Sequence, residues 1–264
     1  MRCSHLVALG CLLVALAAGA AQQPDPAPRY AIVRFVSLQC VKLAPIGLIE
    51  HNHPILLLRN LPLGRELQWR GHTRQGQTLA LPLAAVIENQ ATLRLEEFEF
   101  LGRNQFIGEF TVQAAATAST RTVDFKELGH YRLTYRVEPS KGKLYAVKTL
   151  ELSRNPPPPQ GHLETVQPLV DGFLWRAWAL PRDDSMRAEG ETFVLPAVSQ
   201  VQLNVNLEQE APRDKFKPTS QRGTPTTLPA QAVRWDQQPA GERTLSFKLG
   251  RTTWRLRVDV QPWP

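Results

Sequence analysis

The sequence is poor in the residues on which several classes of protein depend. It contains only 3 Cys and 2 Met in 264 residues. We expect Cys3 and Cys11 to leave with an N-terminal signal, so the mature chain would keep Cys40 alone and form no internal disulfide. Cys40 lies in an apolar, strand-like segment, which predicts a buried side chain rather than a reactive nucleophile. The fold must therefore depend on its hydrophobic core.

Short motifs typical of common enzymes are also lacking. The sequence has no Gly-x-Ser-x-Gly elbow, phosphate-binding loop, dinucleotide fingerprint or paired-cysteine zinc motif. We expect no enzymatic activity and no cofactor, although a triad assembled from distant residues stays open at this stage. The basic residues form no run, and we expect no nucleic-acid partner. Their excess, a formal net charge of +7, is compatible with either an anionic partner or an arginine-rich codon usage.

Long hydrophobic runs are absent beyond the N-terminus, which itself has the three parts of a secretory signal. Met1-Arg2 is followed by an apolar run from Leu6 to Ala18 and then by small residues. The run of about 13 residues is shorter than the ~20 that a membrane-spanning helix needs. We predict a signal peptide over residues 1–21, cleaved near Ala20 or Ala21, and a secreted or periplasmic protein.

What the chain has in quantity is proline, 22 residues of it, together with 42% hydrophobic residues. Proline disfavours helices, and many segments alternate apolar and polar residues with a period of two, as half-buried strands do. The sequence therefore predicts an all-β protein of two sandwich domains in tandem. Residues 79–87 fit either a short helix or a strand.

The domain boundaries follow from the proline-rich stretches. Residues 22–29 form a spacer after the signal, and the run Asn155-Pro-Pro-Pro-Pro159 predicts a stiff linker over residues 153–166. We expect the first sandwich over residues 30–152 and an immunoglobulin-like sandwich over residues 167–264, with a long loop at residues 208–231. The two halves end alike, in Tyr131-Arg-Leu-Thr-Tyr-Arg-Val and Trp254-Arg-Leu-Arg-Val-Asp-Val. Either an internal duplication or the common form of a last strand accounts for this likeness.

The stretch from Glu97 to Gly108 resembles the third calcium loop and following strand of C2 domains. Glu97 and Glu99 fall where that family has Asp, and Gln105 falls on the third Asp. His53-Pro54 and the apolar residues after it are similar to the family's Asp-Pro-Tyr and following strand. The resemblance implies a C2-like sandwich. Since residues 43–50 contain no Asp and Ca²⁺ takes about 6–8 oxygen ligands, it implies a calcium-independent variant.

Two further sets of residues are candidates for a site. His51 and His53 would share one face of a strand, and with His72 they would make a transition-metal site; the alternative is an exposed loop before Pro54. The other candidates, for partner binding, are tryptophans of the second domain: Trp175, Trp178 and Trp235. In a strand, Trp175 and Trp178 would point to opposite faces, which favours a core position for one of them.

Together these features predict a non-enzymatic binding protein of the bacterial cell envelope that engages a protein or glycan partner. The alternative is a peripheral binder of anionic membrane or polymer surfaces through a basic C2-like domain, and a secreted hydrolase is a third hypothesis. The sequence leaves the oligomeric state open.

Overall fold

The computed structural model describes residues 28–43, 53–98, 104–158, 162–175, 178–180, 185–187, 191–209, 226–237 and 239–264. The expected signal peptide and most of the spacer after it lie outside the described residues. All regular elements in the described ranges are β-strands, apart from two single-turn 3-10 helices. None of these elements is a helix with the length and apolar character needed to cross a bilayer. The predicted all-β fold is confirmed, and the ambiguous segment 79–87 is a strand.

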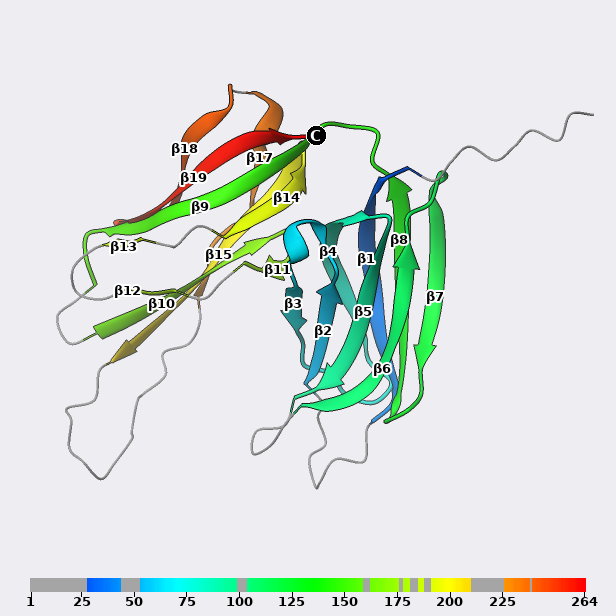
Figure 1. Ribbon diagram of the computed structural model, residues 1–264. Helices are drawn as coiled ribbons and strands as arrows, with labels where there is room; N and C mark the ends of the chain where they lie inside the picture. The colour runs from blue at the N-terminus through cyan, green and yellow to red at the C-terminus, as the bar shows by residue number, and fades with distance from the viewer. Residues whose placement is uncertain are drawn as a thin grey trace, which may run out of the picture.

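The first sandwich has two sheets of four strands, in the orders β4-β1-β8-β7 and β3-β2-β5-β6 (Figure 1). Its strands are β1 (Tyr30–Lys42), β2 (Pro54–Arg59), β3 (Leu67–Arg70), β4 (Thr78–Glu88), β5 (Gln90–Glu97), β6 (Gln105–Gln113), β7 (Ser119–Phe125) and β8 (His130–Pro139), with the turn η1 (Pro62–Gly64). Alternate residues along β1 and β8 are buried, as the period of two requires. An eight-stranded sandwich is what the resemblance to C2 domains implies.

The second sandwich contains the remaining strands. They are β9 (Leu144–Asn155), β10 (His162–Val170), β11 (Phe173–Leu174), β12 (Trp178–Leu180), β13 (Ser185–Arg187), β14 (Thr192–Pro196), β15 (Val198–Gln209), β16 (Thr226–Thr227), β17 (Gln231–Arg234), β18 (Gly241–Leu249) and β19 (Thr252–Trp263), with the turn η2 (Trp235–Gln237). One sheet has the order β13-β9-β19-β18, with β14 also on β9. The other contains β10 and β15, flanked by β12, β16 and β17.

The boundary between the sandwiches differs from the predicted one. Strand β9 pairs along its length with β19 and also with β14, so residues 144–152 belong to the second sandwich and not to the first. Pro156, Pro157 and Pro158 directly follow β9, and the next strand of the same sandwich begins at His162, so no linker between sandwiches lies over residues 153–166. The chain passes from one sandwich to the other at residues 140–143, between β8 and β9. Local composition misplaced the boundary because β9 pairs with β19, whose residues lie roughly 100 positions or more further along the chain.

The two sandwiches repeat one topology. In each, the first strand lies between the last strand and a strand from the middle of the unit: β4-β1-β8-β7 corresponds to β14-β9-β19-β18. A bulge interrupts both central pairs at the matching place, skipping Val36 in β1 opposite Tyr135-Thr134 and Leu150 in β9 opposite Val258-Arg257. Bulges are conserved features of a fold rather than accidents. The shared strand order and bulge favour an internal duplication as the reason that the two halves end alike.

A β-hairpin joins the sandwiches into one body. Strands β10 and β11 are connected by the two residues Asp171-Gly172, both with positive φ (47° and 81°), as a tight two-residue hairpin requires. Strand β11 also pairs with β3, through Leu174 and Gln68. A sheet of ten strands therefore runs without a break from one sandwich into the other (Figure 1).

The tip of this hairpin enters the first sandwich. Phe173 is 1% exposed and lies in the first core, where its ring packs edge-on against Phe35 at 5.8 Å. Asp171 accepts a hydrogen bond from the backbone of Ala84 (3.0 Å) through its carbonyl, and its carboxylate accepts one from the backbone of Gln200 (2.7 Å). One residue is thus bonded to both sandwiches. The sandwiches are fastened together, where the sequence predicted that a proline spacer would hold them apart.

Candidate binding groove

The two stretches that resemble C2 domains, at His53-Pro54 and from Glu97 onward, begin next to each other in the fold. Pro54, at the start of β2, pairs with Glu97, at the end of β5, and Glu97 pairs with Gln105, at the start of β6. His53 therefore lies beside the predicted loop. Glu99 and His51 lie outside the described residues. In the described part of the chain, no group of three or more His, Cys, Asp or Glu side chains is arranged to hold a metal ion.

Glu97 points into the first sandwich instead of toward solvent. Its side chain is 2% exposed and accepts hydrogen bonds from the backbone N–H of His53 and from the Tyr131 hydroxyl (3.2 Å). Burial raises the pKa of Glu97 from 4.5 to about 7, against the opposing effect of these two hydrogen bonds. The neighbouring Cys40 is also buried, and burial raises the pKa of its thiol. Glu97 is thus an internal polar contact rather than a surface calcium ligand.

A second buried carboxylate lies in the second sandwich. Glu164 is 1% exposed, forms an ion pair with Arg154 (2.8 Å) and accepts a hydrogen bond from the indole N–H of Trp254. Burial raises the pKa of Glu164, and its two partners oppose the shift. Neither Glu164 nor Glu97 lines a described cavity. Both carboxylates are bonded to residues of their own sandwich, so we assign them a structural role.

Two of the three tryptophans predicted to bind a partner belong to the second core. Trp235 is 0% exposed and Trp175 is 6% exposed, with the ring of Phe193 edge-on to Trp175 at 5.0 Å. The predicted aromatic platform is therefore wrong for these two residues, because their strands turn them inward to fill the sandwich. The backbone of Trp178 belongs to β12 and pairs with Val166 of β10.

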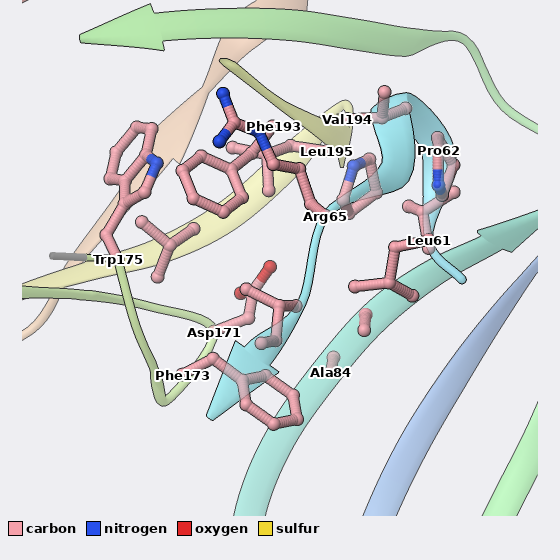
Figure 2. Close-up of a pocket in the computed structure, with 15 residues that line it drawn as sticks. Leu61, Pro62, Arg65, Ala84, Asp171, Phe173, Trp175, Phe193, Val194 and Leu195 are labelled. Atoms are coloured by element: carbon pink, nitrogen blue, oxygen red, sulfur yellow. The ribbon is translucent and has the colours of Figure 1, made fainter. Parts of the chain in front are cut away.

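A small apolar cavity lies where the two sandwiches meet (Figure 2). Leu61 and Ala84 come from the first sandwich, and Trp175, Phe193 and Leu195 face them from the second. Its volume of about 30 Å³ accommodates only one or two waters. We assign this cavity to the packing of the seam rather than to a ligand.

A larger and more polar groove lies on the opposite, outward face of the shared sheet. Its volume is about 460 Å³. It is lined by residues of β3, β11, β10 and β15 and of the hairpin turn: Gln68, Trp69, Arg70, Gln167, Leu169, Gly172, Leu174 and Asn204. The face is settled by alternation, because Val166 and Val170 on β10 and Leu203 and Val205 on β15 are buried in the second core. Their neighbours in sequence therefore face outward.

The polar side chains of the groove are already partly organised. Gln167 and Asn204 are directly opposite each other in the β10–β15 pair. The amide oxygen of Gln68, in the orientation that satisfies both of its polar atoms, accepts from Arg70 Nε at 3.0 Å. The Arg70 guanidinium also lies over the ring of Phe98, 5.4 Å from its centroid. The side-chain oxygen of Asn204 is buried and has no hydrogen-bond partner among the residues that the structure describes.

Sequence reasoning missed these groove residues, although one signal was present. Residues 201–207 alternate strictly, with Gln202, Asn204 and Asn206 between apolar residues. Alternation alone predicts a half-buried strand, and it leaves the outer face as ordinary solvated surface. Only the pairing of β11 with β3 brings Gln68 and Arg70 to the same sheet face as Gln167 and Asn204.

No family model matches the chain, and no curated protein matches it significantly. Among solved structures, it is similar to the pair of C2 domains of extended synaptotagmin 2, with 12% identity over 99% of this chain and 98% of that one, at a TM-score of 0.35. It is also similar to human GIVD cytosolic phospholipase A2, with 10% identity over 90% of this chain and a TM-score of 0.37, but it spans only 33% of that protein. A hemagglutinin of Myxococcus xanthus in complex with a mannopentaose matches over 88% of this chain and 100% of that one, at 8% identity and a TM-score of 0.20. These TM-scores are too low to assign a function to this chain.

Proposed function

We propose that this protein is a non-catalytic binding module that takes up a neutral glycan chain in the groove of the shared sheet. We place it in the bacterial cell envelope, outside the cytoplasmic membrane, where the predicted N-terminal signal would deliver it. The observation that carries the proposal is the groove itself, an open polar concavity of about 460 Å³ built from both sandwiches.

The chemistry of the lining favours a ligand rich in hydroxyl groups. Gln68, Gln167 and Asn204 carry amides, and each amide offers both donors and an acceptor, as hydroxyl groups do. Among the described residues that line the groove, Arg70 alone is charged, so this lining has little net charge. Leu169 and Leu174 add apolar surface for the faces of sugar rings. A groove with few charges favours a neutral saccharide over an anionic polymer.

The unpaired oxygen of Asn204 points to the same class of ligand. A buried polar atom without a partner costs about 1–3 kcal/mol, and rotation of the Asn204 side chain toward the groove would let a ligand hydroxyl remove this cost. The fastening of the two sandwiches by the β10–β11 hairpin holds Asn204 and Gln68 at a fixed separation. Because these groups are held in place before binding, little ordering entropy is lost when a ligand arrives.

Binding to oligosaccharides tests the proposal. Tag-free mature protein is screened on an array of neutral and acidic glycans, and positive glycans are measured by isothermal titration calorimetry. We expect Asn204→Ala and Gln167→Ala each to weaken binding by about fivefold to tenfold, since each removes a hydrogen bond worth ~1–1.5 kcal/mol. Gln113→Ala is the matched control, because Gln113 is an exposed amide on β6 of the same sheet, bonded to Gln90.

Two results would contradict the proposal. The first is binding of a glycan that Asn204→Ala and Gln167→Ala both leave unchanged, which would place the site elsewhere. The second is no glycan binding, together with binding to anionic phospholipid vesicles that falls steeply between about 50 and 200 mM salt, because such screening marks a charged surface as the site.

A further inference from the structure

Two histidines extend the polar face of strand β3 beyond the groove. Ile55 pairs with Arg70, and the backbone N–H of Gly71 donates to Pro54 O at 2.9 Å, so His72 lies opposite His53 as the next pair of the ladder. Since side chains two apart share a face, His72 follows Gln68 and Arg70 on the outward face. The pair lies at the end of the sheet beside Glu97, which belongs to the stretch that resembles the third calcium loop of C2 domains.

The imidazoles face each other through one nitrogen each. The Nδ1 atoms of His53 and His72 are 3.4 Å apart, and the rings are tilted by 51° with centroids 4.8 Å apart. This separation is longer than the roughly 2.7–3.2 Å of an ordinary N–H hydrogen bond. It equals the distance between two nitrogens that bind one tetrahedral metal, because metal–nitrogen bonds of about 2.0–2.1 Å give a nitrogen–nitrogen separation of ~3.3–3.4 Å.

The backbone that carries His53 is held on both sides. Its N–H donates to the buried carboxylate of Glu97, and its carbonyl accepts from the backbone N–H of Phe98 at 3.0 Å. The hydrogen bond between Gly71 and Pro54 fixes the strand that carries His72. Metal sites need ligands that are positioned before the ion arrives, and these contacts supply that support. Both side chains are exposed, so an ion can reach them.

We propose that His53 and His72 form a binding site for a divalent transition metal, with Zn²⁺ or Cu²⁺ as the fitting ions. Two imidazole nitrogens are ligands of the kind these ions prefer, and the remaining coordination positions are filled by water. The inference does not depend on glycan binding, because it is carried by the two histidines alone. The site lies in line with Arg70, so its water-filled positions are exposed toward the same face as the groove.

Metal titration of the tag-free mature protein tests this site. Zn²⁺ binding is measured by calorimetry near pH 7.5, after treatment with a chelator and its removal, and Cu²⁺ binding is followed by electron paramagnetic resonance. We expect one Zn²⁺ per chain and a Cu²⁺ spectrum with hyperfine splitting from two nitrogens. His53→Ala and His72→Ala should each weaken Zn²⁺ binding by about tenfold or more, because losing a direct ligand exceeds the loss seen for supporting residues.

A third histidine provides the matched control. His130 is bonded to Asp124 at 3.2 Å on another strand, so His130→Ala should leave the affinity for Zn²⁺ unchanged. Thermal melts check that each variant folds, and we expect them to fold because the His53 and His72 side chains are exposed. The proposal is overturned by an absence of Zn²⁺ binding up to millimolar concentration, or by binding that either alanine variant leaves intact. Binding that depends on His51 in place of His72 overturns it as well.

Discussion

Replacing Phe173 with alanine tests the fastening of the two sandwiches most directly. Phe173 belongs to the hairpin of the second sandwich, but its 1%-exposed ring fills a space in the core of the first, against Phe35. Truncating a buried Phe to Ala costs about 3–5 kcal/mol, from lost transfer free energy and the cavity that remains. A folded protein is stable by only about 5–15 kcal/mol, so this loss is large.

The measurement is amide hydrogen exchange at the seam together with urea unfolding. The N–H of Ala84 donates to Asp171 O at 3.0 Å, so its protection reports whether the hairpin is docked. We expect protection at Ala84 to fall by about 100-fold or more in Phe173→Ala, since each 1.4 kcal/mol is a factor of ten. Phe247→Ala is the control, because Phe247 is also 1% exposed but lies only in the second core. A loss below about 1 kcal/mol with full protection at Ala84 would refute the reasoning.

Three further predictions concern the buried groups of the first sandwich. The pKa of Glu97 is raised from 4.5 to about 7, so the folded state binds this proton more tightly than the unfolded state does. The free energy of unfolding should therefore fall by about 3 kcal/mol as the pH rises from 4.5 through 7. Glu97→Gln should abolish this part of the pH dependence in urea titrations with chelator present; an unchanged slope would contradict it. Burial raises the pKa of the Cys40 thiol, so Cys40 should react with a disulfide reagent only when the protein unfolds. Rapid labelling of the native protein would show that Cys40 is not buried. Millimolar Ca²⁺ should stabilise the protein by less than about 1 kcal/mol in thermal melts, because Glu97 faces the core; a large rise in melting temperature would show that the loop holds the ion.

The strands could be predicted from the sequence more reliably than their grouping. Alternation identified β8 and β15, because one face of each is buried and the other is solvated. The grouping of β9 could not be read locally, since the prolines after Asn155 have the composition of a linker while β9 pairs with β19 at the far end of the chain. The division at residues 140–143 has no such marker.

The candidate site was predictable only in part. The resemblance to C2 domains assigned His53 and Glu97 to separate motifs of that family, and the structure brings the two residues together at one end of a sandwich. Their direction was not predictable, because Glu97 turns inward to Tyr131 whereas His53 turns outward to His72. Trp175 and Trp235 were misassigned because large aromatic residues serve cores and binding surfaces alike, and only packing distinguishes the two roles. The groove arises from a single long-range bridge between Leu174 and Gln68, which no local pattern encodes.

The bridge between β11 and β3 also protects the protein from self-association. Strand β3 is the outermost strand of its four-stranded sheet within the first sandwich, and an open strand edge with free N–H and C=O groups can recruit the same strand of another molecule. Here β11 of the second sandwich pairs with that edge, and Phe173 fills the neighbouring space in the core of the first sandwich. A truncated chain ending after β8 would lose both covers at once. Residues 30–139 expressed alone would therefore expose the unpaired edge of β3 beside the apolar cavity that Phe173 fills in the full chain. We expect this fragment to aggregate rather than to fold as an independent domain.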